Sequence, residues 1–203
     1  MAEHAPWVTP NKNSGSGNDT VAWTASVRTG RTARQTTATF SASGVTPKVL
    51  TIIQAGKAEY VSFDSASATI DKTGGTLTIT GKTNSSKLTF ALTGQNGIGL
   101  VLPAKYLANS VQTNNGAAIT GDPGAEEEFV FSITFSDIAE NTTIDQLVSQ
   151  LTVTPNSGNA AVCNITQAAG DAYLNISPTT INLTAAGTAV SVAVESNTSW
   201  TVS

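Results

Sequence analysis

The sequence predicts an all-β protein, and three observations support this fold class. Thr, Ser, Ala, Gly and Asn dominate the 203 residues, and only 12% of the residues are charged. Apolar and polar residues alternate in short stretches such as DTVAWTASV (19–27), KVLTIIQAG (48–56) and TAVSVAVES (188–196). Gly, Asn, Ser and Pro separate these stretches, as turns between strands require. This pattern is typical of sandwiches of short strands, about seven per domain.

One stretch departs from the strand pattern. Ile144, Leu147, Val148 and Leu151 fall at helical spacing within residues 143–151. Thr143 or Asn141 precedes them and could cap a helix. The spacing therefore predicts a short helix here.

Composition and charge exclude several classes of function. The net charge is −4 and the ten Lys and Arg residues are scattered, so we expect no nucleic-acid partner. No apolar run approaches the length that spans a membrane, and we expect no membrane contact. Cys163 is the only cysteine and lies in an alternating stretch, which predicts a small core residue. If Met1 is the natural start, the N-terminus lacks an export signal.

The chain contains an internal repeat. Residues 60–90 (YVSFDSASATIDKTGGTLTITGKTNSSKLTF) align without a gap on residues 173–203 (YLNISPTTINLTAAGTAVSVAVESNTSWTVS). Residues 39–55 align at the same offset on residues 152–168, and every matched pair is separated by 113 positions, which we call the repeat offset. An offset shared by two blocks indicates one repeating structural unit.

The repeat predicts two β-sandwich domains with unusual boundaries. One domain covers residues 59–170 and is lengthened by the stretch 92–127. Residues 1–57 match only the second part of the repeat, which we call its back. Residues 172–203 match only the first part, which we call its front. We expect these two pieces to form one composite domain, assembled from the N- and C-terminal halves.

The composite resembles the BACON family (Bacteroidetes-associated carbohydrate-binding, often N-terminal) along its whole length. The matching features come in the family's order when the front is joined to the back: NTSW with Trp200, then Trp7, SGSG (14–17), Arg31, Arg34 and VLTIIQAG (49–56). The resemblance implies an immunoglobulin-like sandwich. The domain 59–170 departs from the pattern, since Lys87 stands where the first Trp should be. It is similar to a diverged BACON-like or immunoglobulin-like domain.

A front or a back alone cannot bury both sheets of a sandwich. Trp7, Trp23, Trp200 and Val202 are therefore predicted to lie at a seam where the two pieces meet. The pieces could close within one chain, which is the preferred prediction, or between chains, which follows closely. A third reading is that the chain is part of a longer array.

The sequence contains no recognisable catalytic constellation, so we expect no enzyme, no cofactor and no metal. The only histidine, His4, is predicted to be a tail or seam residue. The acidic cluster Asp122, Glu126, Glu127 and Glu128 lacks the ligand spacing of a calcium loop. It is predicted to be a solvated approach to a strand.

Two functions remain. The first is a structural virion protein of a tailed (crAss-like) phage of Bacteroidetes: capsid decoration, head fibre or tail accessory. Its partners would be other virion proteins or copies of itself, and residues 92–127 would dock on them. The second is a carbohydrate-binding or spacer module of a bacterial cell-surface protein. Tyr106, predicted to be an exposed ring in the long stretch, would then contact a glycan.

Overall fold

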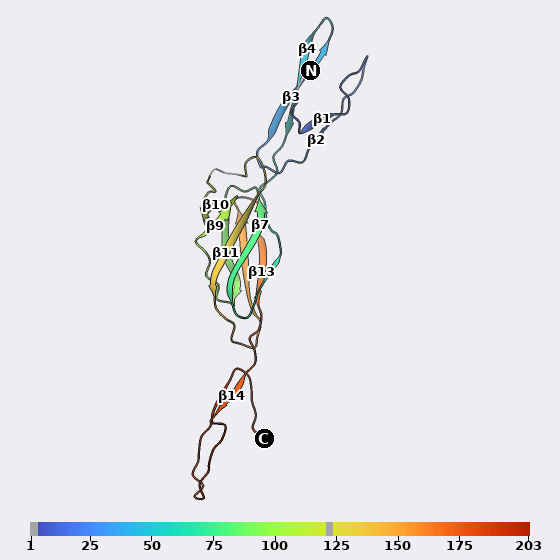
Figure 1. The fold of residues 1–203 in the computed structure, drawn as a ribbon. Coiled ribbons are helices and arrows are strands. Elements are labelled where there is room, and N and C mark those ends of the chain that lie inside the picture. The colour runs from blue at the N-terminus through green and yellow to red at the C-terminus, as the bar shows by residue number, and fades with distance from the viewer. Residues whose placement is uncertain (1–3, 121–123) are drawn as a thin grey trace.

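The computed structural model describes residues 4–120 and 124–203, and it confirms the all-β class. Fifteen strands and no helix occur in these two ranges, so none of the described residues forms a helix that could cross a membrane. The strands form three groups that follow one another along the molecule (Figure 1). We call them the N-terminal segment (residues 4–57), the central sandwich (59–170) and the C-terminal segment (172–203).

The central sandwich consists of two sheets. The first has the order β10-β9-β11-β7-β5. Its strands are β5 (Val61–Phe63), β7 (Gly75–Thr83), β9 (Lys105–Ala108), β10 (Val111–Asn114) and β11 (Phe129–Ile138). The second has the order β6-β13-β12-β8. Its strands are β6 (Ser67–Ile70), β8 (Leu88–Asn96), β12 (Leu147–Pro155) and β13 (Ala161–Gln167), and β6 runs parallel to β13.

The core lies between these two sheets and follows from the alternation of the sequence. Phe131, Ile133 and Phe135 are every second residue of β11, and all three are almost fully buried. Phe131 packs edge to face on Phe90 of the opposite sheet at 5.6 Å between ring centroids. Burying each such side chain contributes about 1.5–3 kcal/mol to the stability of the fold. Cys163 is also fully buried in this core, which confirms its predicted role.

The stretch 92–127 adds to the central sandwich. It supplies β9 and β10 at one edge of the five-stranded sheet. Its apolar residues Ile98, Leu100, Ala108 and Ile119 belong to the core. Much of this stretch is therefore integrated in the sandwich, and its docking on a partner stays a prediction.

The predicted helix at 143–151 is wrong, because β12 begins at Leu147. Alternate residues of β12, including Ser149, Leu151 and Val153, point into the core. Strand β12 pairs with β13 on one side and β8 on the other. Pairing on both sides of a strand outweighs the weaker helical spacing of its first residues.

The N-terminal segment consists of two antiparallel hairpins. Strand β1 (Val8–Pro10) pairs with β2 (Trp23–Ala25), and β3 (Arg34–Ala42) pairs with the long β4 (Val45–Gln54). The C-terminal segment has one hairpin, β14 (Leu174–Ser177) with β15 (Ala193–Ser196). In Figure 1 the two segments lie at opposite ends of the central sandwich. The structure therefore does not show the preferred alternative, closure within one chain.

Candidate functional site: the two open segments and their joints

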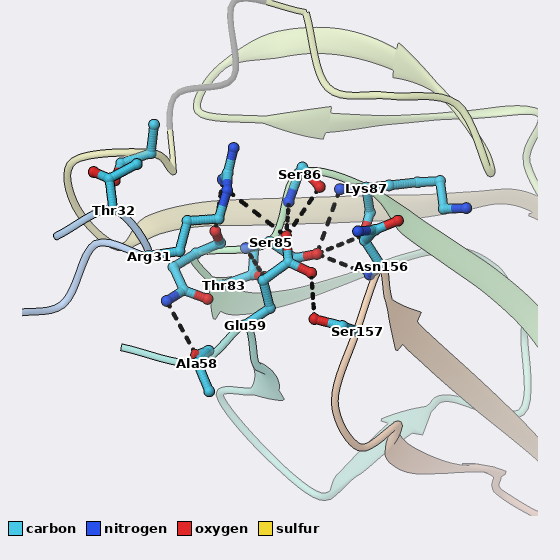
Figure 2. A network of polar contacts seen from close by, with 12 residues as sticks. Arg31, Thr32, Ala58, Glu59, Thr83, Ser85, Ser86, Lys87, Asn156 and Ser157 are labelled. Carbon is cyan, nitrogen blue, oxygen red and sulfur yellow. Dashed lines mark hydrogen bonds and ion pairs between the residues drawn. The ribbon is translucent and has the colours of Figure 1, made fainter. Parts of the chain in front are cut away.

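The N-terminal segment is fixed to the central sandwich by a polar network around Glu59 (Figure 2). The backbone nitrogen and hydroxyl of Ser86 donate to Glu59 Oε1 at 3.0 and 2.9 Å. The hydroxyl of Ser157 donates to Oε2 at 2.8 Å, and Arg31 Nε lies 3.7 Å from Oε1. Burial by itself raises the pKa of Glu59, but hydrogen bonds from Ser86, Ser157 and Asn156 outweigh it, and the net pKa is lowered. Glu59 is therefore held as a carboxylate.

Further contacts tighten this joint. Arg28 pairs with Glu126 at 2.7 Å, which lowers the pKa of that carboxyl. The backbone nitrogen of Thr32 donates to the Ala125 carbonyl at 3.0 Å. Gly30 passes so close to Glu126 that a Cβ at position 30 would lie 2.0 Å from its carbonyl oxygen. The N-terminal segment thus lies directly on the central sandwich.

Asn84 lies at the centre of this joint and is fully buried. Its Nδ2 donates to the carbonyls of Thr29 and Ala58 at 3.0 and 3.3 Å, and its Oδ1 accepts from the backbone nitrogen of Tyr60 at 3.0 Å. One side chain thereby connects the N-terminal segment, Ala58 between the two units, and Tyr60 directly before the first strand of the central sandwich.

The joint to the C-terminal segment repeats these contacts one repeat offset later. Asn197 Nδ2 donates to the carbonyls of Thr142 and Asp171 at 3.0 and 2.8 Å. Its Oδ1 accepts from the backbone nitrogen of Tyr173 at 3.0 Å. The backbone bond from Gly170 to Thr143 likewise corresponds to the one from Lys57 to Gly30. The central sandwich is therefore joined to the C-terminal segment as the N-terminal segment is joined to the central sandwich.

The C-terminal segment folds like the front of the central sandwich, but among the described residues no back packs against it. Strand β14 pairs with β15 in the same register as β5 with β7, shifted by the repeat offset. The side chains that correspond to core positions are nevertheless exposed. Leu183 is 64% exposed, whereas its counterpart Ile70 is 6% exposed. Leu174, Ile176 and Val192 are exposed as well. Exposed apolar side chains gathered on one face of a domain indicate a contact surface.

The N-terminal segment has the fold of a back without its front. Strand β3 pairs with β4 in the register of β12 with β13, again shifted by the repeat offset. Phe40 is 45% exposed, although its counterpart Val153 is fully buried. Leu50 is also exposed, and its counterpart Cys163 is not. A groove of about 570 Å³ in this segment is lined by His4, Val21, Trp23, Ala38 and Phe40, among others.

The structure places the four predicted seam residues in two separate groups. The guanidinium of Arg34 lies over the Trp7 ring at 4.5 Å, and His4 contacts the Trp23 ring edge-on at 5.5 Å. Trp200 and Val202 lie at the other end of the molecule, 49% and 85% exposed. The contact of Trp200 with Trp7 or Trp23 is therefore not made within the chain, and the seam stays a prediction.

The predicted exposed ring of Tyr106 is wrong. Tyr106 is 3% exposed, because it faces inward from β9, and its ring lies 4.9 Å from that of Phe90. Burial raises its pKa to about 12. The position of Tyr106 in the long stretch 92–127 suggested that its ring is exposed. Part of that stretch, however, forms β9 and β10 of the five-stranded sheet. Tyr106 is a core residue with no surface for a glycan.

The two joint asparagines carry a structural role that the sequence reasoning did not assign. Asn84 and Asn197 are matched as repeat partners by the alignment, which does not by itself reveal their role. The available signal was the match of the two asparagines across the repeat offset. No such match marks Glu59, because the residue one repeat offset later is Ala172.

In the part of the chain that the structure describes, no group of three or more His, Cys, Asp or Glu side chains is placed to hold a metal ion. Glu126 of the acidic cluster is bound by Arg28, and Glu128 accepts a hydrogen bond from the Tyr60 hydroxyl. Asp122 lies outside the described residues. These two acidic side chains thus take part in protein contacts.

Comparisons with known proteins add no family. No protein-family model matches the chain, and no curated protein matches it significantly. The BACON and immunoglobulin-like resemblance therefore stays a prediction.

Proposed function

We propose that this chain is a non-enzymatic structural protein that assembles with copies of itself, the C-terminal segment of one copy completing the N-terminal segment of the next. The observation that carries this proposal is the pair of open segments at opposite ends of the central sandwich (Figure 1). Each exposes side chains whose repeat counterparts are buried, such as Leu183 and Phe40. The two faces match because one is a front and the other is a back.

Association has a clear driving force. Burying a fully exposed Leu, Ile, Val or Phe side chain contributes about 1.5–3 kcal/mol, and a partly covered one contributes a part of this, from which the cost of bringing two copies together is subtracted. Several such residues lie on each face, among them Leu174, Ile176 and Leu183 on one and Phe40 and Leu50 on the other. Their combined burial favours the contact between copies.

The most concrete role is in the virion of a tailed phage of Bacteroidetes. An elongated chain with a complementary surface at each end suits a head fibre or tail accessory, and capsid decoration is the related choice. This part of the proposal depends on the BACON resemblance and on analogy between folds. Cryo-electron microscopy of virions of the phage that encodes the chain tests it, with density for repeated sandwiches as the expected result and its absence as the contrary one.

One observation favours the alternative, a carbohydrate-binding or spacer module at a bacterial cell surface. Trp200 and Tyr173 are about half exposed, and exposed aromatic rings can stack on sugars. A glycan array distinguishes the two functions. Binding that is lost in Trp200→Ala, with the assembly state unchanged, would support the alternative.

Assembly itself is tested by light scattering of the 203-residue chain over a range of concentrations. We expect the mean mass to rise continuously with concentration above the mass of one chain. A mass of one chain at every concentration would contradict the proposal.

A further inference from the structure

We propose a specific strand register for the contact between copies: residues 51–54 of β4 pair in parallel with residues 180–183 of a second copy, Thr51 opposite Thr180 and Gln54 opposite Leu183. This inference rests on the proposed function, and it names the strands, the register and the direction of assembly. It comes from the central sandwich, where a front and a back are already joined.

The central sandwich supplies the template. Strand β13 of its back runs parallel to β6 of its front, with Asn164 opposite Ser67 and Gln167 opposite Ile70. Subtracting the repeat offset from the back positions and adding it to the front positions gives the proposed pairs. The register can be transferred for the back, because β3 and β4 keep the register of β12 and β13. It can be transferred for the front, because β14 and β15 keep the register of β5 and β7.

Both members of the proposed pair are free to accept a partner. Strand β4 belongs to a two-stranded sheet and pairs only with β3 among the described strands, so its other edge is open. Residues 180–183 lie in no strand, although their counterparts form β6. An open strand edge presents unpaired backbone groups, which pair readily with an extended segment of another chain. The second copy would thus order residues 180–183 as a strand.

Gln54 provides a polar indication of the same register. Its counterpart Gln167 donates from Nε2 to three carbonyls: Ala139 at 2.8 Å, Lys72 at 3.3 Å and Asp71 at 3.4 Å. Gln54 Nε2 donates to the Ser26 carbonyl at 2.8 Å, which corresponds to Ala139. Lys72 and Asp71 belong to the front, and their counterparts are Ala185 and Thr184. In the proposed register these two carbonyls of the second copy would meet Gln54.

The joints set the direction of assembly. The central sandwich carries its N-terminal neighbour at one end and its C-terminal neighbour at the other (Figure 1). A composite domain completed in the same way would have the central sandwiches of two copies at its opposite ends. Copies therefore add head to tail in a single file, which is a heterologous and open arrangement rather than a two-fold dimer.

Disulfide trapping between variants that each carry one introduced cysteine tests the register. Thr51 and Thr180 are exposed, and their counterparts Asn164 and Ser67 face outward, so cysteines there should leave the fold intact. Paired residues lie about 5 Å apart between Cα atoms, which a disulfide can span. Cys163 is fully buried and burial raises its pKa, so it should not compete.

A mixture of Thr51→Cys and Thr180→Cys chains should form a disulfide-linked pair under mild oxidation. The matched control is Thr51→Cys mixed with Asn182→Cys, which lies on the same face but about 8 Å from position 51, beyond the reach of a disulfide. We expect at least a tenfold lower yield in the control. Equal or reversed yields, with assembly intact, would overturn the register but not the proposed function. A wild-type chain that never assembles would overturn both.

Discussion

Asn84 and Asn197 share three equivalent hydrogen bonds at two joints related by the repeat offset. The Nδ2 of each donates to a threonine carbonyl of the preceding unit, Thr29 for Asn84 and Thr142 for Asn197, both at 3.0 Å. The Oδ1 of each accepts the backbone nitrogen of a tyrosine at 3.0 Å. The chain is thus built as a row in which each unit is attached to the next by one repeated joint.

The first prediction concerns this joint. Asn84→Ala removes an amide that is fully buried and leaves backbone carbonyls and a nitrogen without their partner. We expect a loss of about 1–3 kcal/mol in the free energy of unfolding, measured by urea denaturation. Asn197→Ala should cost less, because Asn197 is only partly buried. An Asn84→Ala chain as stable as the wild type would show that the Asn84 amide contributes nothing to the stability of the joint.

The second prediction concerns pH. The pKa of Glu59 is lowered from its ordinary value of 4.5. A lowered pKa in the folded state stabilises the fold above the ordinary value, and this contribution disappears as the pH falls through the folded pKa. Wild type and Glu59→Gln should therefore differ in Tm at pH 7, with the wild type more stable, and the difference should shrink below about pH 4.5.

Thermal unfolding of both proteins between pH 3 and pH 7 measures this difference. Asp171→Asn is a suitable control, because Asp171 forms an exposed ion pair with Lys72 at the other joint. Exposed pairs contribute little to stability, so the control should follow the wild type closely. A difference between wild type and Glu59→Gln that is constant over this pH range would contradict the role of the carboxylate.

The third prediction concerns Trp200. In the single chain this residue is 49% exposed, so Trp200→Ala should hardly change the stability of the central sandwich. If Trp200 is buried at the seam between copies, its loss should weaken association by about 3–5 kcal/mol. Sedimentation velocity measures the association. Leu107→Ala is the control, because Leu107 is similarly exposed on the central sandwich. Equal association of the wild type, Trp200→Ala and Leu107→Ala would show that Trp200 does not lie at the seam.

The fourth prediction concerns Tyr106. Its ring is buried against Phe90, so Tyr106→Ala should destabilise the fold by about 3–5 kcal/mol. Tyr106→Phe keeps the ring and should cost far less. Denaturant unfolding compares the two variants. A Tyr106→Ala chain with unchanged stability would contradict the core position.

Sequence reasoning reached the strand pattern and the repeat, but not every side-chain environment. The alternation around Cys163 predicted its burial correctly, because strand periodicity directly reports which face is inside. Tyr106 obeys the same rule, since it occupies an inward position of β9. Residues 143–151 show helical spacing, and the pairing of β12 with two neighbouring strands overrides it. Local sequence does not contain that information.

The arrangement of the segments also lay beyond the sequence. The repeat offset identified a front and a back, but a repeat gives no direction in space. The relative positions depend on Gly30, Glu59 and Asn84, which bring backbone and side chains of different units together. Such contacts between distant residues follow from the folded joint, not from a periodic pattern.

The central claim is that the C-terminal segment of one copy completes the N-terminal segment of another. It is tested most directly by blocking one face in each of two variants. Leu183→Asp places a charge on the exposed front, and Phe40→Asp places one on the exposed back, near the tip of its hairpin. Burying an unpaired charge is strongly unfavourable, so each variant alone should stay a monomer. Leu107→Asp, outside both faces, should assemble like the wild type.

The decisive measurement is the mass of an equimolar mixture of Leu183→Asp and Phe40→Asp by light scattering. In each mixed pair, the Leu183→Asp chain supplies its intact back and the Phe40→Asp chain supplies its intact front. The two remaining faces of the pair carry the introduced charges. We predict a mass of two chains that does not grow further with concentration. A mixture that stays at the mass of one chain while the wild type assembles, or a single variant that assembles alone, would contradict completion between copies.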